Sequence, residues 1–441
     1  MSSKVRLQGT MRINDKGHLE IGGCDVVDLA ASLGTPLYIL DEALLRQNCR
    51  RYYQAFTGQN ENDLVLYASK AFLVLAMARI IQDEGLGLDV VSGGELAIAL
   101  TAGFPAEKIF LHGNNKSAAE IRYALRCGVG RIVVDNYYEL ELVERICGEM
   151  ALKAAILLRI APGIEAHSHS YISTGQVDSK FGFTMENGDA LRAVKKALAS
   201  PHFELKGVHC HIGSQILELE AFRLAGRVMM DFLAEARQRT GWTAEELDLG
   251  GGLGVYYSEG DDPPTIEEYA RAVKESVADK CREHAFPRPR IIVEPGRSIV
   301  SPAGTTVYTI GSMKDIPGIR KYVAVDGGMT DNPRPALYQA KYEGIIANKA
   351  AEEAAEVVSI TGRCCESGDM LIWDLPVPRV EAGDLLAIFS TGAYNYSMSS
   401  NYNALLRPAV VLVLDGKADV IVERETWGDL IRNHRLPERL L

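Results

Sequence analysis

The alternation of short β-branched runs with helical patterns is the feature that most constrains the fold of this chain. Eight such runs occur from residue 64 onward, within about 230 residues: Leu64–Tyr67, Leu88–Ser92, Ile109–His112, Ile132–Asp135, Ala155–Ile160, Leu205–His211, Leu247–Gly250 and Ile291–Glu294. Each of the first seven is followed by an amphipathic pattern. Strands that alternate with helices pair in parallel through right-handed crossovers. Eight units of this length predict an α/β fold, a closed (β/α)8 TIM barrel, because an open doubly wound sheet usually has fewer strands.

The pattern changes after residue 302 and is also different before residue 37. Short extended runs without long helices follow one another at 305–310, 322–325, 357–361, 385–389, 410–414 and 420–425, which predicts an all-β second domain. The first 36 residues hold two extended pieces and a short helix, Val26–Leu33, and are too few to fold alone. We therefore expect a barrel at 37–302 and a discontinuous, mostly β domain of 1–36 plus 303–441, to which the early pieces add strands.

Composition excludes several kinds of partner. The chain has 58 acidic and 47 basic residues, a net charge of −11 and no basic run, which disfavours nucleic acid and anionic membranes. The start has no signal-peptide apolar block, and no apolar run reaches 18 residues. Its 8 cysteines include no Cys-x-x-Cys pair and suit free thiols in a reducing compartment. These features predict a cytoplasmic protein.

Polar residues follow the predicted strands at the end where barrel enzymes place their chemistry. In strand order they are Lys70, Asp89 and Ser92, His112 and Asn114, Asp135 and Asn136, Arg159, His209 and His211, Gly250–Gly254, and Glu294 with Arg297. A single residue of this kind is often structural. Their presence at every strand end predicts a catalytic site at the carboxyl-terminal mouth of the barrel.

Four of these strand ends together suit an aldehyde cofactor with a phosphate and a pyridine ring. Lys70 can act as an amine nucleophile, and the glycines of 250–254 let backbone N–H groups converge on a phosphate. Glu294 can hydrogen-bond a protonated pyridine nitrogen, and His211 can stack on the ring. Taken singly, these are also consistent with a solvated lysine, an ordinary turn and a Glu294–Arg297 ion pair. Taken together they predict pyridoxal 5′-phosphate (PLP).

Seven motifs, in order along essentially the whole chain, carry a family resemblance: Tyr67–Ala71, Ser179–Gly182, His209–Ser214, Gly250–Gly254, Glu294–Arg297, Cys365–Asp369 and Gly392–Tyr394. They resemble the PLP-dependent decarboxylases of alanine-racemase fold, and most closely the diaminopimelate decarboxylase family. The resemblance implies a homodimer of barrel plus β-domain, with active sites completed across the dimer interface.

The resemblance also assigns roles to individual residues. Lys70 would attach the cofactor covalently, and Cys365 would be the catalytic proton donor, contributed across the dimer with Glu366. The implied cofactor-binding residues are Lys70, Asp89, His211, Ser214, Gly251, Gly252, Glu294, Gly296, Arg297 and Tyr394. Where many relatives have Gly-Pro-x-Cys-Glu-Ser, this chain has Gly362-Arg-Cys-Cys-Glu-Ser. The role of Cys364 therefore stays open.

Substrate specificity depends on whether the substrate has a second α-amino and carboxylate pair, here called the second amino-acid head. Diaminopimelate carries one, and recognising it needs a guanidinium for the carboxylate and a carboxylate for the ammonium. The family's substrate residues correspond to Arg297, Arg334, Tyr338, Glu366 and Tyr394, and the two prolines beside Arg334 restrict its backbone. The expected reaction is decarboxylation of meso-2,6-diaminopimelate to L-lysine and CO2, the last step of lysine biosynthesis.

Other functions remain open at this stage. Within the fold, the substrate could instead be ornithine, lysine, arginine or carboxynorspermidine. An inactive regulatory homologue would be expected to have lost Lys70 or Cys365, and this chain keeps both. A racemase would need a tyrosine base opposite the lysine, which we do not place. His167 and His169 have a possible metal spacing but no evident third ligand, so no metal site is predicted.

Overall fold

The computed structural model describes residues 5–58, 62–164 and 179–441. The chain forms two compact units. One, here called the barrel unit, consists of Arg46–Val255 and Asp261–Ile299, and the other, the β unit, consists of Met1–Leu45, Tyr256–Gly260 and Val300–Leu441. In this division residues 37–45 and 300–302, which the sequence predicts to be part of the barrel, belong to the β unit. The segment 256–260 belongs to the β unit although it lies within the barrel part of the sequence.

The barrel unit is built on eight parallel strands that close into a ring, as the sequence predicts. They are β5 (Leu64–Ala68), β6 (Gly87–Val90), β7 (Ile109–Leu111), β8 (Arg131–Val134), β9 (Ala154–Ala161), β11 (Phe203–His209), β12 (Glu246–Asp248) and β13 (Arg290–Val293). Consecutive strands pair in register, and β13 pairs with β5 to close the ring. A ninth short strand, β10 (Phe183–Thr184), adds to β9. Each strand predicted from 64 to 294 is therefore confirmed within a few residues.

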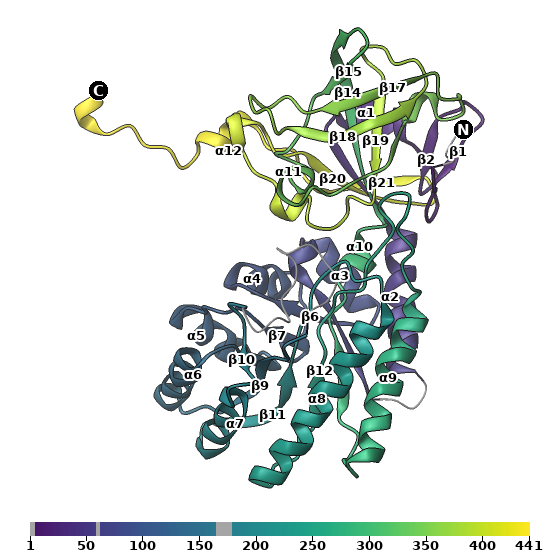
Figure 1. Cartoon of the computed structure of the whole chain (residues 1–441). Coiled ribbons are helices and arrows are strands. Elements are labelled where there is room, and N and C mark those ends of the chain that lie inside the picture. The colour runs from purple at the N-terminus through teal and green to yellow at the C-terminus, as the bar shows by residue number, and fades with distance from the viewer. Residues whose placement is uncertain (1–4, 59–61, 165–178) are drawn as a thin grey trace. The chain divides into compact units, whose positions relative to one another are not determined.

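Helices surround this ring on the outside (Figure 1). They are α2 (Glu42–Thr57), α3 (Leu75–Asp83), α4 (Gly93–Thr101), α5 (Ala118–Cys127), α6 (Tyr137–Met150), α7 (Asp189–Ala199), α8 (Leu219–Thr240) and α9 (Ile266–Glu283). Two of these helices begin with a capping box, which Ser117 and Thr265 each form with the glutamate three residues later. Leu66, Phe110, Val133, Leu157 and Ile292 form a buried cluster contributed by five of the strands. This packed core leaves the strand ends as the place for polar chemistry.

The β unit is a mixed sheet whose main path runs β18-β17-β15-β14-β4-β20-β21, with β19 and β16 added at β14. The strands are β4 (Leu37–Asp41), β14 (Gly304–Ile316), β15 (Arg320–Val325), β16 (Gly344–Ile346), β17 (Glu356–Thr361), β18 (Met370–Val377), β19 (Leu385–Phe389), β20 (Ala409–Leu414) and β21 (Lys417–Val422). Its short helices are α1 (Val26–Leu33), α11 (Arg334–Tyr338) and α12 (Trp427–Ile431), and α10 (Arg297–Val300) spans the boundary between the units. The unit is mostly β, as expected.

The N-terminal segment differs from the expectation in one respect. Its strands β1 (Arg12–Ile13), β2 (Leu19–Ile21) and β3 (Cys24–Asp25) form a separate three-stranded sheet rather than extending the larger one. The strand that joins the larger sheet is β4, which pairs with β14 and β20. All five residues of β4 are buried, which is the pattern of an interior strand.

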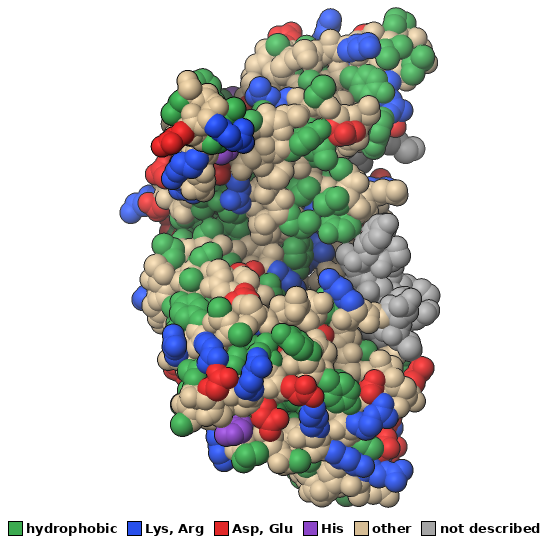
Figure 2. Space-filling view, turned by 90° about the vertical axis from the view of Figure 1, so that its left-hand side faces the viewer, with side chains coloured by type: hydrophobic (Ala, Val, Ile, Leu, Met, Phe, Trp, Pro, Cys, Tyr) green, Lys and Arg blue, Asp and Glu red, His purple; other side chains and the backbone are tan. Residues whose placement is uncertain are grey.

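The charged side chains on the described surface are distributed as expected for a chain without a basic run. On the face drawn in Figure 2, lysine and arginine side chains lie among acidic ones rather than in one patch. No described helix is both long and apolar enough to cross a bilayer. The eight cysteines form no disulfide.

Candidate active site

Lys70 lies directly after the first barrel strand. It is in the middle of a 3-10 turn, Ser69–Ala71, and its Nζ donates a hydrogen bond of 2.9 Å to Asp89 Oδ2. The Asp89 side chain is almost fully buried, whereas 39% of the Lys70 side chain is exposed. Asp89 belongs to β6, the neighbour of β5 in the ring. A buried carboxylate therefore holds an amine that remains accessible at the strand end.

The end of β13 packs closely against the Lys70 turn. Ala68 N–H donates to the Pro295 carbonyl at 3.1 Å. A Cβ placed on Gly296 would lie 3.0 Å from the Cβ atoms of both Ala68 and Ala71. Glycine at 296 thus allows this close approach, and the segment that carries Glu294 lies beside the segment that carries Lys70.

Two histidines from other strands meet the Glu294 carboxylate. His209 Nε2 is 3.2 Å from Oε2 in a hydrogen bond, and His112 Nε2 is 2.8 Å from Oε1. His112 is also 3.7 Å from Asp89 Oδ1. Lys70, Asp89, His112 and Glu294 therefore form a continuous chain of polar contacts at one end of the barrel.

The Glu294 carboxylate is ionised despite its burial. Burial alone would raise its pKa, but the two histidines outweigh this and hold the pKa of Glu294 well below its ordinary value. Its Oε1 has no aligned hydrogen-bond partner among the described residues. This buried, charged acceptor suits a protonated ring nitrogen, which supports the role expected for Glu294.

His211 follows β11 and accepts a hydrogen bond of 3.3 Å at Nδ1 from the Gly251 N–H. Burial, followed by the nearby cations Lys70 and Arg159, lowers the pKa of His211 well below its ordinary value. The imidazole is therefore neutral, as a ring that stacks on an aromatic cofactor should be.

An anion-binding group lies next to these residues. Arg297 Nη2 and Nε donate to Ser214 Oγ at 2.8 and 3.2 Å. The glycine run comes close to neighbouring backbone, since a Cβ on Gly251 would lie 2.1 Å from the Glu294 carbonyl oxygen and one on Gly252 2.5 Å from that of Gly213. A guanidinium, a hydroxyl and glycine backbone gathered in this way fit a phosphate group. The residues of the barrel unit thus fit PLP.

The remaining expected residues belong to the β unit. Cys365 and Glu366 are exposed on a turn, and Asp369 shapes that turn by accepting from the backbone N–H of Cys364 at 2.8 Å and of Met329 at 2.7 Å. Cys364 is buried, and burial together with Asp369 raises the pKa of its thiol to about 11. Of the two neighbouring thiols, only that of Cys365 is exposed for chemistry.

Arg334 lies at the start of α11 and is held by two tyrosines. Its Nη1 donates to the Tyr342 hydroxyl at 2.6 Å, and its guanidinium carbon lies 4.8 Å from the centre of the Tyr257 ring. The two tyrosine rings meet edge to face at 5.3 Å. Tyr338, at the other end of α11, and Tyr394, which has a left-handed backbone (φ 61°), are partly exposed. Arg334 is thus a fixed cation, as a substrate clamp requires.

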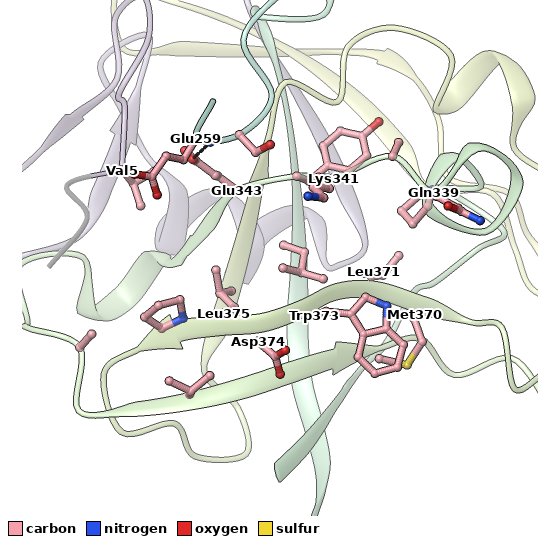
Figure 3. A pocket seen from close by; sticks show the side chains of 18 of the residues that line it. Val5, Glu259, Gln339, Lys341, Glu343, Met370, Leu371, Trp373, Asp374 and Leu375 are labelled. Carbon is pink, nitrogen blue, oxygen red and sulfur yellow. Dashed lines mark hydrogen bonds between the residues drawn. The ribbon is translucent and has the colours of Figure 1, made fainter. Parts of the chain in front are cut away.

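A groove of about 1380 Å³ in the β unit is lined partly by the residues that follow Arg334. Figure 3 shows Trp373 and Leu375 of β18 on one side of it and Lys341 and Glu343 on the other. The Trp373 side chain is largely exposed. The groove is therefore an accessible surface with an aromatic side chain in its wall.

Two groups of described residues bring possible metal ligands together: His112, His209 and Glu294, and Asp231, Glu283 and His284. In the first group the atoms lie at hydrogen-bond distances. In the second, Lys280 already pairs with Asp231 at 2.9 Å, which disfavours a cation. The histidines 167 and 169 lie outside the described residues.

Sequence reasoning did not give a role to some residues of this site. His112 and His209 are among the predicted strand-end residues, but their contact with Glu294 is not visible in the sequence. Asp248, at the end of β12, was not singled out. Burial, followed by the charge of Glu294, raises its pKa well above the ordinary value, so this carboxyl holds a proton.

Comparison with known proteins identifies the family. Residues 42–301 match the family model of the pyridoxal-dependent decarboxylase pyridoxal-binding domain. Diaminopimelate decarboxylase of Bacillus subtilis is 53% identical over 97% of both chains, and that of Staphylococcus aureus is 44% identical over 96% of this chain and 99% of its own.

Solved structures agree with the sequence comparison. Diaminopimelate decarboxylase from M. jannaschii in complex with L-lysine has a TM-score of 0.91 at 38% identity and covers 98% of this chain and 99% of its own. The Helicobacter pylori enzyme with L-lysine has a TM-score of 0.84 at 34% identity, covering 92% of this chain and 98% of its own. The chain therefore belongs to the diaminopimelate decarboxylase family of pyridoxal-dependent decarboxylases.

Proposed function

We propose that this protein uses PLP to decarboxylate meso-2,6-diaminopimelate, giving L-lysine and CO2. The observation that carries the proposal is the chain of contacts from Lys70 through Asp89 and His112 to Glu294 at one end of the barrel. An amine nucleophile and an ionised acceptor for a pyridine nitrogen are thereby held on neighbouring strands. The similar enzymes solved with L-lysine support lysine as the product.

In this proposal each site residue of the barrel unit has one role. When bound, the cofactor supplies an electron sink for the pair of electrons left as CO2 departs. Lys70 holds the cofactor's aldehyde carbon, and Arg297, Ser214 and the 250–254 backbone bind its phosphate. Glu294 keeps the proton on the ring nitrogen, and the neutral His211 packs on the ring.

The residues of the β unit recognise and protonate the substrate. Arg334, fixed by Tyr342 and Tyr257, binds the carboxylate of the second amino-acid head, and Glu366 binds its ammonium. Tyr338 and Tyr394 contribute hydroxyl groups to the substrate and phosphate. Cys365 donates a proton to the α-carbon.

We further propose a homodimer in which Cys365 and Glu366 of one protomer complete the active site of the other. Two observations support this. Both residues are exposed on a turn of the β unit, and the same unit carries an accessible groove with the exposed Trp373 in its wall. Eight unpaired cysteines support action in the reducing cytoplasm.

Product identification tests the proposal. The purified protein with added PLP is incubated with meso-diaminopimelate, and separately with ornithine, lysine and arginine, while CO2 and amine products are measured. We expect CO2 and L-lysine from diaminopimelate alone. Release of CO2 from another of these amino acids in preference would refute the substrate assignment.

The role of Lys70 needs its own test. The Lys70→Ala variant should lose the visible absorbance of cofactor attached to the protein, together with turnover. An exposed-lysine variant, Lys417→Ala, serves as the control for removing a lysine. An unchanged visible spectrum in Lys70→Ala would rule out Lys70 as the attachment point.

A further inference from the structure

The Glu294 carboxylate is approached from two directions across the barrel. His209 ends β11, which is two strands away from β13 in the ring, and His112 follows β7, three strands away on the other side. Each histidine presents Nε2 to a different carboxylate oxygen, at 3.2 and 2.8 Å. All three side chains are at most about one-twentieth exposed. The carboxylate is thus hydrogen-bonded by His209 at Oε2, while His112 lies beside Oε1 without an aligned hydrogen bond, and burial restricts the movement of all three side chains.

The histidine rings also support one another. Their centres are 5.0 Å apart and their planes are inclined at 72°, an edge-to-face contact. The orientation of one ring therefore restricts that of the other. Both rings contact Glu294 and lie outside the Arg297–Ser214 pair that fits a phosphate.

Resting on the proposed function, we infer that His209, supported by His112, is a positioning residue that fixes the Glu294 carboxylate and keeps it ionised, so that Glu294 can hold a proton on the pyridine nitrogen. A protonated Glu294 would be unable to accept that hydrogen bond, and the ring would be a weaker electron sink.

The protonation of His209 agrees with this assignment. Burial lowers the pKa of His209 to about 4, against the raising effect of Glu294, so the ring is neutral near pH 7 and carries one proton. That proton belongs on Nε2, since the neighbouring carboxylate can only accept. Nδ1 has no hydrogen-bond partner among the described residues, as expected for the unprotonated nitrogen.

The other charged groups around Glu294 fit the same assignment. Asp89 is engaged by Lys70, and Asp248 of the intervening strand β12 carries a proton. Arg159 pairs with Asp135 at 3.8 Å. Among these carboxyl groups, Glu294 is the one that depends on histidine for its charge.

Replacing His209 by phenylalanine tests the inference, because a ring remains but the donor is lost. In infrared difference spectra of the full-length protein, His209→Phe is expected to gain a protonated-carboxyl band near neutral pH. The band should vanish in the double variant with Glu294→Gln, which assigns it to Glu294. The rate kcat should fall roughly 10- to 100-fold with little change in KM, as for loss of a hydrogen bond to a charged group.

The His209→Gln variant separates positioning from general damage. Its amide N–H can reach the place of Nε2, so the carboxylate should stay ionised and most of the rate should return. His284→Gln, at a surface histidine that pairs with Asp231, is the matched control and should resemble the wild type. If the kcat of His209→Gln falls as far as that of His209→Phe, or if His209→Phe shows no protonated-carboxyl band, the inference is wrong.

Two further results remain decisive. Should His209→Phe fail to fold by near-ultraviolet circular dichroism, His209→Met replaces it, since methionine adapts to irregular space. Failure of both to fold would overturn the inference in favour of a purely structural role. If the wild type takes up no PLP, the proposed function fails, whereas the infrared band still decides whether His209 keeps Glu294 ionised.

Discussion

Asp331 provides a prediction whose size follows from the structure. It lies in the β unit, three residues before Arg334, and is 2% exposed. Its carboxylate accepts from the Tyr308 hydroxyl at 2.6 Å and from the Gly328 N–H at 3.0 Å, and its backbone carbonyl accepts from the Tyr38 hydroxyl. Asp331 thus anchors the loop that leads to Arg334.

Burial dominates the ionisation of Asp331. It raises the pKa of the carboxyl from 3.8 to about 7, although the hydrogen bonds from Tyr308 and Thr330 lower it. Between these two values the folded chain binds the proton more tightly than the unfolded chain. The free energy of unfolding contributed by this group therefore falls as pH rises, by about 1.4 kcal/mol for each pH unit, or about 4 kcal/mol between pH 4 and pH 8.

The Asp331→Asn variant cannot ionise and should lack this pH dependence. Its free energy of unfolding relative to the wild type should rise by about 4 kcal/mol between pH 4 and pH 8, because other titrating groups cancel in the difference. Urea unfolding at pH 4, 6 and 8, followed by tryptophan fluorescence and circular dichroism, measures it.

Asp384→Asn is the matched control, because Asp384 should give the free energy of unfolding a pH dependence of the opposite sign. Hydrogen bonds from Lys349 and Asn348 lower the pKa of Asp384 although burial alone would raise it. Its charge therefore stabilises the fold above the unfolded pKa, and this stabilisation is lost as pH falls. If the unfolding free energies of Asp331→Asn and the wild type run parallel from pH 4 to 8, the reasoning for Asp331 is refuted.

Three further variants test individual features of the site. Tyr342→Phe removes the hydrogen bond to Arg334 and should raise KM for diaminopimelate roughly tenfold with kcat retained, as steady-state kinetics will show. Gly251→Ala would place a Cβ 2.1 Å from the Glu294 carbonyl oxygen, so we expect a destabilisation of about 1–3 kcal/mol by urea unfolding and weaker uptake of PLP. Cys364→Ala should keep the wild-type rate of CO2 release, since this thiol is buried and protonated; a lost rate would give Cys364 a catalytic role.

The barrel could be predicted because its determinants are local. Each strand is a short buried run, and each helix has its own apolar period and cap, as at Ser117 and Thr265. Parallel pairing then brings the strand ends to one side without any knowledge of side-chain contacts. Lys70 and Glu294 follow neighbouring strands for this reason, since β5 and β13 pair once the ring closes.

Features of the β unit that depend on distant partners were not predictable. The strand β18 was missed because its pattern is interrupted at Asp374, which has a left-handed backbone (φ 52°), with Trp373 exposed beside it. The strand β4 precedes a long helix and resembles the start of a barrel unit. It is instead buried between β14 and β20, whose sequences lie more than 260 residues further along the chain.

The charge states of the site are a property of the assembled ring and not of any single strand. The strands β6, β12 and β13 carry three carboxyl groups at or near their ends: Asp89, Asp248 and Glu294. Nothing in the sequence shows which of the three is protonated. In the structure Asp89 accepts a hydrogen bond from Lys70, Asp248 keeps its proton, and Glu294 is ionised beside two histidines. Three like charges in one buried ring would repel strongly, so one must be neutral and the others must have partners. A change at His209 should therefore move a proton onto Glu294 even though it alters no carboxyl group, which is why the charge of Glu294, rather than its presence, is the quantity to measure.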